Sequence, residues 1–509
     1  MKKIFTIIAA ALMMSAQVFA VTTKDVCGQF KGFLQIGWEP YPDKVIYLLP
    51  GATENTVTFV LPDFTFGEGK LGNIVLTNLA VDATGKLSME PTTMYLDTLE
   101  LRAQIAVLES YFDDYDSTTY YSVLSPERAQ VTLSIGAPTL AEDIIVTFDG
   151  EVVSGHNYAL PNGGFEGNWT NGEPAGWHSF NSATGLLVDF VKGTDQFKQS
   201  TVVRPGTKGN YSALLSTKMA AGVPANGNCT NGQINAGSMT ADAAADNYNF
   251  SDPTNEGFNT PFNGRPDSIA FWVKYQPADK NPANEVNKAR MSTIITTNAR
   301  YQDPEAADYS EVKVATAAIN YAATSDMGWQ RIAVPFNYID IEREPAYILT
   351  TFTTNQVPAG GSSSRGKMDS LYLDDVELIY NKTLTSFSIN EDELVFNEHI
   401  ASIEETYCDS CADYIAAAQG VSTQTFIGFD ATHKCIHVYV IADDFAQSGA
   451  YQMYRIEFSD SETDDLDPIE EGIENVQMNT IDSEKVLING QLFIRRGDMW
   501  FNAAGVRVK

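Results

Sequence analysis

Short apolar runs separated by turns make up the N-terminal part of the chain. They cover residues 30–36, 56–61, 73–76, 131–135 and 144–148. In the second run Val57, Phe59 and Leu61 share one side of an extended chain, which is the period-two pattern of a half-buried strand. Residues 96–112 fit either a helix or two strands. Repeated strands of this kind predict a β-barrel or β-sandwich over residues 21–152.

The middle of the chain, residues 156–381, combines regular strands with long polar loops. Strands are predicted at residues 267–275, 329–336, 346–352 and 370–380. In the first of these Ile269, Phe271, Val273 and Tyr275 share one face of the strand. The loops are rich in Asn, Gly and Thr, above all in residues 222–264. Long loops joined to regular strands are typical of a jelly-roll sandwich that presents a ligand face.

A third, smaller β-unit is predicted over residues 382–461, with strands at residues 384–389, 435–440 and 454–458. Residues 462–483 follow as an acidic linker with little to bury. Residues 484–509 then form two short strands around a turn. The pattern as a whole predicts an all-β, multidomain chain.

The first 20 residues read as a signal peptide. Lys2 and Lys3 precede an apolar stretch over residues 4–14, and Val18 and Ala20 supply the small residues of a cleavage site. Export to the cell surface, the secreted fraction or the periplasm is therefore expected. No later stretch has the about 18 consecutive apolar residues that a membrane-spanning helix needs. We therefore do not expect an integral membrane protein.

The net charge of the chain restricts the classes of partner that we expect. It has 65 acidic residues against 33 basic ones, a net charge of −32. A field of that sign repels phosphate backbones, which excludes nucleic acid as an expected partner. Neutral or cationic ligands and other proteins remain.

Several segments resemble known families. The sequence of residues 56–76, with Asp63-Phe64-Thr65-Phe66-Gly67 between two apolar runs, resembles the calycin-like domain of secreted Bacteroidetes proteins, which implies a small meander barrel. Residues 382–461 resemble cadherin-like or immunoglobulin-like repeats. Residues 484–509 resemble the C-terminal sorting tails of type IX secretion cargo, which implies a contact with export machinery. The alternative for this last segment is a final hairpin of the preceding domain.

The longest resemblance spans residues 156–381. It rests on Asn162-Gly163-Gly164-Phe165-Glu166, on the run Gly264-Arg265-Pro266-Asp267-Ser268-Ile269-Ala270-Phe271-Trp272-Val273-Lys274-Tyr275, and on Leu371-Tyr372-Leu373-Asp374-Asp375-Val376-Glu377-Leu378. This segment resembles the carbohydrate metabolism domain family of Bacteroidetes. The resemblance implies a jelly roll that handles glycans, and it does not specify hydrolysis.

Two sets of residues in this segment are candidates for binding. Glu166 near its first strand and Asp374 or Asp375 in its last would offer the oxygen ligands of a structural calcium ion; the alternative is solvated surface acids. Aromatic rings stack on the flat faces of sugars while polar groups take the hydroxyls. The candidates for such an aromatic platform lie in or beside loops: Trp169, Trp177, Tyr211, Tyr248, Phe262 and Arg265. For any one of them, core packing is the competing interpretation.

Carboxylates and cysteines leave further alternatives open. Glu166, Glu173, Asp195 and Asp267 are available for the carboxylate pair of a glycosidase, although spacing in the sequence does not place them together. Disulfide candidates are Cys408, Cys411 and Cys435, for example with Cys435 bound to either of the others. Free thiols, or zinc held with His433 and His437, are the alternatives.

The favoured prediction is therefore an exported, non-catalytic carbohydrate-binding protein that binds glycan on the jelly roll. A glycoside hydrolase and a structural or adhesive surface protein are the alternatives.

Overall fold

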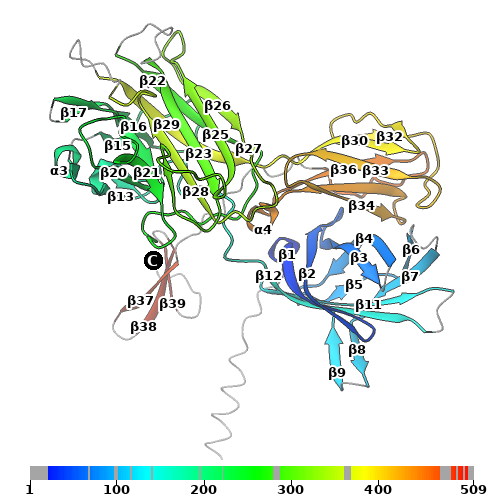
Figure 1. Ribbon diagram of the computed structural model, residues 1–509. Coiled ribbons are helices and arrows are strands. Elements are labelled where there is room, and N and C mark those ends of the chain that lie inside the picture. Colours follow the sequence, from blue (N-terminus) through cyan, green and yellow to red (C-terminus); the bar gives the residue numbers. More distant parts are fainter. Residues whose placement is uncertain are drawn as a thin grey trace, which may run out of the picture.

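The computed structural model describes residues 21–66, 69–96, 101–114, 117–138, 142–193, 196–220, 222–278, 287–359, 368–469, 483–488, 491–496 and 499–502. As predicted, the chain is all-β, with several sheets and very short helices. Figure 1 shows the large sandwich on one side, and the small sandwich above the curled N-terminal sheet on the other. No helix in the described ranges has the length and apolar character needed to cross a membrane.

The N-terminal sheet follows the short helix α2 (Thr23–Val26). Its strands are β1 (Gly28–Ile36), β2 (Glu39–Pro50), β3 (Thr56–Phe66), β4 (Gly69–Val81), β5 (Leu87–Ser88), β6 (Thr92–Leu96), β7 (Leu101–Val107), β10 (Val123–Leu124), β11 (Arg128–Gly136) and β12 (Ile144–Val152). Their order is β5-β4-β3-β2-β1-β12-β11-β7-β6. The sheet curls, but its end strands β5 and β6 do not pair in the described residues. The ambiguous residues 96–112 are strands: β7, then β8 (Ser110–Asp113), which pairs with β9 (Thr118–Tyr121).

Alternation along β3 gives this sheet two buried faces. Val57, Phe59 and Leu61 pack in the cluster that fills the curled sheet. Val60 belongs to a different cluster, shared with the small sandwich, and Thr58 is also buried. The period-two pattern of β3 thus places one set of side chains inside the sheet and the other against a neighbouring body.

The large sandwich begins with one short strand pair, β13 (Trp169–Thr170) with β14 (Glu173–Pro174), followed by the 3-10 helix η2 (Phe180–Ser182) and the short helix α3 (Val188–Val191). One sheet has the order β15-β16-β29-β22-β26 and the other β19-β28-β23-β25-β27. The bounds of the first are β15 (Phe197–Ser200), β16 (Ser212–Ser216), β22 (Ser268–Gln276), β26 (Gln330–Pro335) and β29 (Ser370–Ile379). Those of the second are β19 (Asn228–Thr230), β23 (Ala289–Thr296), β25 (Lys313–Tyr321), β27 (Asn337–Tyr338) and β28 (Tyr347–Thr353).

Two smaller sheets flank this sandwich. A hairpin is made of β17 (Lys218–Ala220) and β18 (Val223–Ala225), and a three-stranded sheet of β20 (Gln233–Ala236), β21 (Asn247–Ser251) and β24 (Tyr301–Asp303). Between the two five-stranded sheets lies a core in which Phe271 meets Phe352 edge to face, with ring centroids 5.0 Å apart. This core leaves the outer face of β19, β28 and β23 free to meet the three-stranded sheet.

The small sandwich pairs two sheets, β31-β30-β33 and β32-β36-β35-β34. The strands are β30 (Thr383–Ile389), β31 (Asp392–Glu393), β32 (Ile400–Ser402), β33 (Tyr414–Gln419), β34 (Gln424–Asp430), β35 (Cys435–Ile441) and β36 (Tyr451–Glu457), with α4 (Phe445–Ser448) before the last. At the end of the described chain, β37 (Ser483–Ile488), β38 (Gln491–Arg496) and β39 (Met499–Asn502) form a separate three-stranded sheet.

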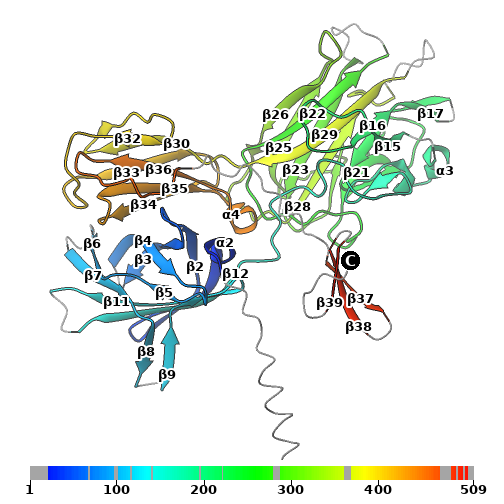
Figure 2. The same cartoon turned by 180° about the vertical axis from the view of Figure 1, so that it is seen from behind.

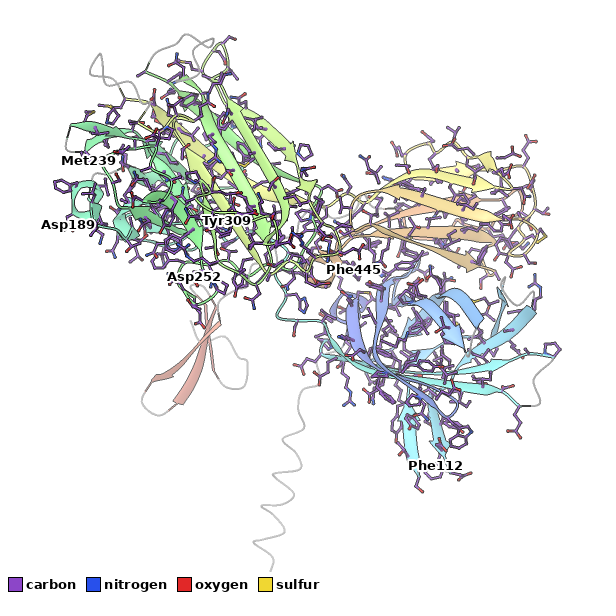
Figure 3. All side chains as sticks on the ribbon, viewed as in Figure 1. Phe112, Asp189, Met239, Asp252, Tyr309 and Phe445 are labelled. Atoms are coloured by element: carbon purple, nitrogen blue, oxygen red, sulfur yellow. A yellow bond between two sulfur atoms is a disulfide. The ribbon has the colours of Figure 1, made fainter. Side chains whose placement is uncertain are left out.

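The small sandwich packs directly on the outer face of the N-terminal sheet, as both views show (Figures 1 and 2). Tyr47 and Leu49 of β2 share a buried cluster with Phe426, Tyr439 and Phe445. Figure 3 labels Phe445, which lies on α4 where the three bodies meet. Two segments separated by hundreds of residues therefore share one apolar core.

Candidate functional site

A groove of about 450 Å³ opens on the large sandwich, between its outer sheet face and the elements that flank it. Its lining comes from η2, α3, the β17–β18 hairpin, the β20-β21-β24 sheet and residues 353–359. The volume lies within the range of about 300–1,000 Å³ that small-molecule sites span. Figure 3 labels Met239, one of the lining residues, on the side of the sandwich that carries α3.

The floor of the groove is polar and braced. Asn228, Thr353 and Arg290 lie side by side because β28 pairs with both β19 and β23 in this register. Asn249 and Asp303 stand opposite each other on β21 and β24. Asn228 Nδ2 donates to Asn249 Oδ1 over 3.0 Å. Arg290 donates to both oxygens of Asp303, over 2.9 and 3.0 Å. These contacts fix the floor, because a bidentate guanidinium–carboxylate pair restricts both distance and plane.

Two side-chain oxygens of groove-lining residues have no hydrogen-bond donor in the described chain. The Oδ1 atoms of Asn226 and Asn228 are buried, and neither has a hydrogen-bond partner within the described chain. Asn226 Nδ2 donates to the carbonyl oxygens of Asn355 and Val357 over 3.2 and 2.9 Å, which holds its amide in place. An unsatisfied buried acceptor costs about 1–3 kcal/mol. Asn226 and Asn228 line the groove, so their amides belong to its polar floor, with both oxygens closed off from solvent.

The opposite wall is apolar. Its buried part is a small cluster of Val191, Ala220 and Ala236, against which Phe180 and Ala225 pack. Phe190 and Met239 line the same groove and are 56% and 47% exposed. Exposed apolar side chains at the mouth of a polar-floored groove are a surface on which a ligand with an apolar face can lie.

Tyr248 adds an aromatic ring to the lining of the groove. It lies on β21, is half-buried, and lines the groove. The guanidinium of Arg300 lies over its ring at 5.5 Å from the centroid and donates to its hydroxyl over 3.3 Å. The cation holds one face of the ring and so fixes its orientation.

Of the six residues predicted as an aromatic platform, Tyr248 alone lines this groove. The prediction is wrong for Trp177 and Phe262, which are fully buried in the core of the large sandwich. Their large apolar surface is better satisfied there than in water, and Trp177 Nε1 donates to the Pro161 carbonyl over 2.9 Å.

The other three predicted residues lie away from the groove. Trp169 packs on Phe197, with ring centroids 5.1 Å apart. Tyr211 donates its backbone N–H to Glu166 over 2.8 Å. Arg265 donates hydrogen bonds to the backbone carbonyls of Ile341 and Arg343, so its guanidinium holds neighbouring loop backbone in place. Phe190, Asn226, Asn228, Arg290 and Asp303 were missed because no local sequence pattern joins them.

The predicted calcium ligands are not grouped as a cation cluster in the part of the chain that the structure describes. Glu166 Oε1 accepts the backbone N–H groups of Asn210 and Tyr211 over 2.7 and 2.8 Å. Asp375 pairs with Arg204 at 2.5 Å. Asp374 is buried, and burial together with the charge of Asp375 raises its pKa to about 7. A calcium ion takes six to eight oxygen ligands, which can include backbone carbonyls and water, so the calcium site stays a prediction.

The predicted carboxylates for hydrolysis also have structural partners. Glu173 is held by Ser179 and Ser182, each through its backbone N–H and hydroxyl. Burial works to raise the pKa of Glu173, but hydrogen bonds from His178 and these serines outweigh it and lower the pKa. Asp267 accepts the N–H groups of Asn381 and Val421. Asp195 lies outside the described residues.

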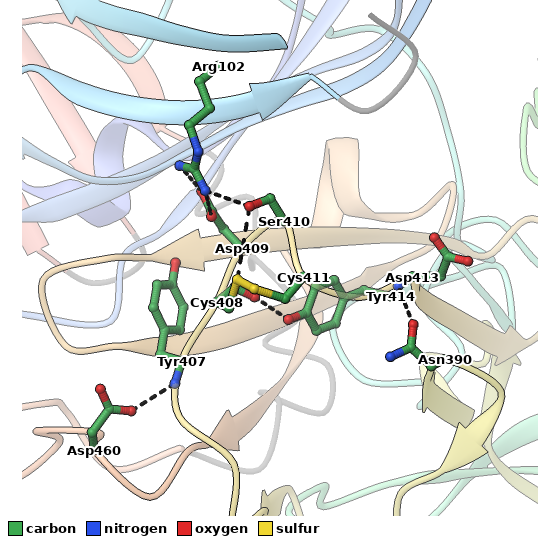
Figure 4. Close-up of a disulfide and its surroundings, with 10 residues drawn as sticks. All are labelled: Arg102, Asn390, Tyr407, Cys408, Asp409, Ser410, Cys411, Asp413, Tyr414 and Asp460. Carbon is green, nitrogen blue, oxygen red and sulfur yellow. Dashed lines mark hydrogen bonds and ion pairs between the residues drawn. A yellow bond between two sulfur atoms is a disulfide. The ribbon is translucent and has the colours of Figure 1, made fainter. Parts of the chain in front are cut away.

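The cysteine prediction is partly corrected. Cys408 and Cys411 form a disulfide with each other (Figure 4). Cys435 is a buried free thiol. Asp409, which lies between Cys408 and Cys411 in the sequence, accepts two hydrogen bonds from Arg102 of the N-terminal sheet over 3.2 and 2.5 Å. Cys435 does not pair because its strand, β35, places it opposite Asp430 of β34.

No protein-family model matches the sequence, and no curated protein matches it. Two solved structures resemble parts of the chain. The structure of TmCBM61 in complex with β-1,4-galactotriose is 13% identical, with a TM-score of 0.21, and covers 44% of this chain and 98% of that one. The CBM22-1–CBM22-2 tandem domain from Paenibacillus barcinonensis Xyn10C is 11% identical, with a TM-score of 0.22, and covers 70% and 94%. At such low TM-scores, neither likeness carries an argument about this chain.

Proposed function

We propose that the protein is an exported, non-catalytic carbohydrate-binding protein that binds a glycan in the groove of the large sandwich. The observation that carries this proposal is the pairing of a braced polar floor, which includes Asn228, Arg290 and Asp303, with an exposed apolar and aromatic wall. A sugar has both complementary surfaces: hydroxyl donors at its edge and an apolar face above its ring. Export is inferred from the signal-peptide pattern of residues 1–20.

The charge of the groove favours a neutral glycan. Arg290 and Asp303 are the charged residues among the described lining, and they neutralise each other through two hydrogen bonds. An anionic ligand would have to compete with Asp303 for the guanidinium, and a cationic one with Arg290 for the carboxylate. A neutral hydroxyl-rich ligand leaves the pair intact.

The same lining favours binding over hydrolysis. A glycosidase acts through two carboxyl groups about 5–9.5 Å apart. Asp303 is the single carboxylate among the described lining residues, and it is paired with Arg290. Binding, by contrast, needs only the fixed polar floor and the apolar wall.

A glycan-array scan of the chain without residues 1–20 tests the proposal, followed by recovery and analysis of the bound glycans. We expect selective binding of neutral glycans that are recovered intact. Recovery of cleaved products would overturn the non-catalytic assignment in favour of a hydrolase. Failure to bind any glycan would overturn the proposal and favour a structural or adhesive role.

A further inference from the structure

A buried cluster of three different ligand types lies far from the groove, in the small sandwich where it meets the N-terminal sheet. Asp430 stands directly opposite Cys435 in the β34–β35 pair. His437 follows Cys435 by two residues, so both side chains point to the same face of β35. All three residues are at most 1% exposed. A carboxylate, a thiol and an imidazole thus converge in the protein interior.

The distances within the cluster suit a shared ion. Cys435 Sγ lies 3.4 Å from His437 Nε2, which lies 3.4 Å from Asp430 Oδ2. The three atoms all lie within 4.8 Å of one another. Zinc bonds of about 2.3 Å to sulfur and about 2.0–2.2 Å to nitrogen and oxygen, at tetrahedral angles, separate neighbouring ligand atoms by about 3.4–3.6 Å. Two of the three separations match these values, and the third, between Cys435 Sγ and Asp430 Oδ2, is at most 4.8 Å.

Hydrogen bonding alone accounts less well for His437. A separation of 3.4 Å is longer than the usual 2.7–3.2 Å of an N–H···O hydrogen bond, so its Nε2 is poorly satisfied by Asp430. Its Nδ1 is buried and has no partner among the described residues. An imidazole buried with two weakly satisfied nitrogens is costly, and a metal bond to Nε2 would offset that cost.

The surroundings orient the carboxylate as they do around known metal ligands. Asp430 Oδ1 accepts the backbone N–H groups of Thr432 and His433, each over 3.1 Å. Its Oδ2 accepts Asn78 Nδ2 over 2.7 Å and lies 2.7 Å from His433 Nδ1. Such partners fix the direction of a ligand and tune its affinity for metal. Asn78 belongs to β4, so the N-terminal sheet helps to orient a ligand of the small sandwich.

We propose that Asp430, Cys435 and His437 bind one zinc ion or a similar divalent transition-metal ion, with water as the fourth ligand. The mixture of sulfur, nitrogen and oxygen ligands favours this class over calcium or magnesium, which prefer oxygen alone. On binding, Cys435 becomes a thiolate and releases its proton to solvent. The ion would brace the contact between the small sandwich and the N-terminal sheet, independently of glycan binding.

Cobalt substitution tests the site in the full chain. The protein is stripped with a chelator, dialysed and titrated with Co²⁺, and Zn²⁺ is then added as competitor. We expect one Co²⁺ per chain, a thiolate-to-cobalt charge-transfer band, and loss of that band on adding Zn²⁺. The variant Cys435→Ser should lose the band, whereas Cys229→Ser, which changes a buried thiol of the large sandwich, should keep it.

Binding without a thiolate band, or binding unchanged in Cys435→Ser, would show that surface carboxylates hold the ion and would overturn the proposal. If Cys435→Ser does not fold, the stripped wild-type chain supplies a second measurement. Zn²⁺ should raise its unfolding temperature, because a ligand that binds only the folded state stabilises it. Mg²⁺ at the same concentration should not. Equal effects of the two ions, or no effect of Zn²⁺, would contradict the site.

Discussion

The contact between the N-terminal sheet and the small sandwich contains one buried hydrogen bond that can be removed cleanly. The hydroxyls of Thr58 on β3 and Tyr439 on β35 lie 2.9 Å apart, although 381 residues separate them in the sequence. Both residues are fully buried. The variants Tyr439→Phe and Thr58→Val each delete one hydroxyl with little change of shape.

The structure sets the size of the effect. Either single variant leaves one buried hydroxyl without its partner, which costs about 1–3 kcal/mol. The double variant replaces both hydroxyls with apolar groups and should be nearly neutral. Because the two single costs add while the double variant costs almost nothing, the cycle should give a coupling energy of at least about 2 kcal/mol, in the upper part of the range of about 0.5–3 kcal/mol for residues in contact. At about 1.4 kcal/mol for each factor of ten, a single variant should speed exchange of the protected amides by about 5–150-fold.

Hydrogen exchange read by mass spectrometry measures this in the full chain, peptide by peptide. Each single variant should lower the protection of both β3 and β35, and the double variant should restore most of it. Tyr321→Phe is the matched control, because the buried Tyr321 hydroxyl has no partner among the described residues and lies in the large sandwich. Loss of protection in β35 alone, or a cycle without coupling, would refute a shared core.

Three further predictions concern the large sandwich. Burial and the charge of Asp375 raise the pKa of Asp374 to about 7, against about 3.9 in the unfolded chain. Between these two pH values the folded state binds more protons than the unfolded state. The free energy of unfolding should therefore fall as the pH rises from about 4 to 7. Urea unfolding across that window should show this slope, and Asp374→Asn should flatten it. Because the predicted calcium ligands are already engaged, glycan binding should be the same with calcium and with chelator, and a loss with chelator would contradict our assignment of Glu166. Asp303→Asn should weaken glycan binding at least about tenfold, because it frees Arg290 from its bidentate pair. Amide protection of β3 should not change. An affinity equal to that of the wild type would show that the Arg290–Asp303 pair is not part of the binding site.

The strands were largely predictable because their signal is local. Alternation of Val57, Phe59 and Leu61 predicted β3, and the alternation starting at Ile269 predicted β22. Period-two patterning requires only neighbouring residues, and both strands have one face in an apolar core. The same pattern did not reveal that Thr58 and Val60 face a second body, because that depends on a segment more than 350 residues away.

The groove was not predictable from residue type. Aromatic residues in loops were expected to bind, but Trp177 and Phe262 gain more by filling the core. The polar floor joins Asn228, Arg290 and Asp303, which only strand register brings together. The prediction of a disulfide at Cys435 failed for the same reason. Strand register places Cys435 opposite Asp430, and register could not be read from the sequence.

Titration calorimetry with the strongest neutral glycan from the array tests the central claim most directly. It compares the wild-type chain with Tyr248→Ala, Tyr248→Phe and the control Phe112→Ala, an exposed aromatic on β8. Loss of the Tyr248 ring should cost about 1–2 kcal/mol, or about 5–30-fold in affinity. Tyr248→Phe and Phe112→Ala should bind like wild type. Unchanged affinity in Tyr248→Ala, or a loss equal to that in Phe112→Ala, would contradict glycan binding in the groove.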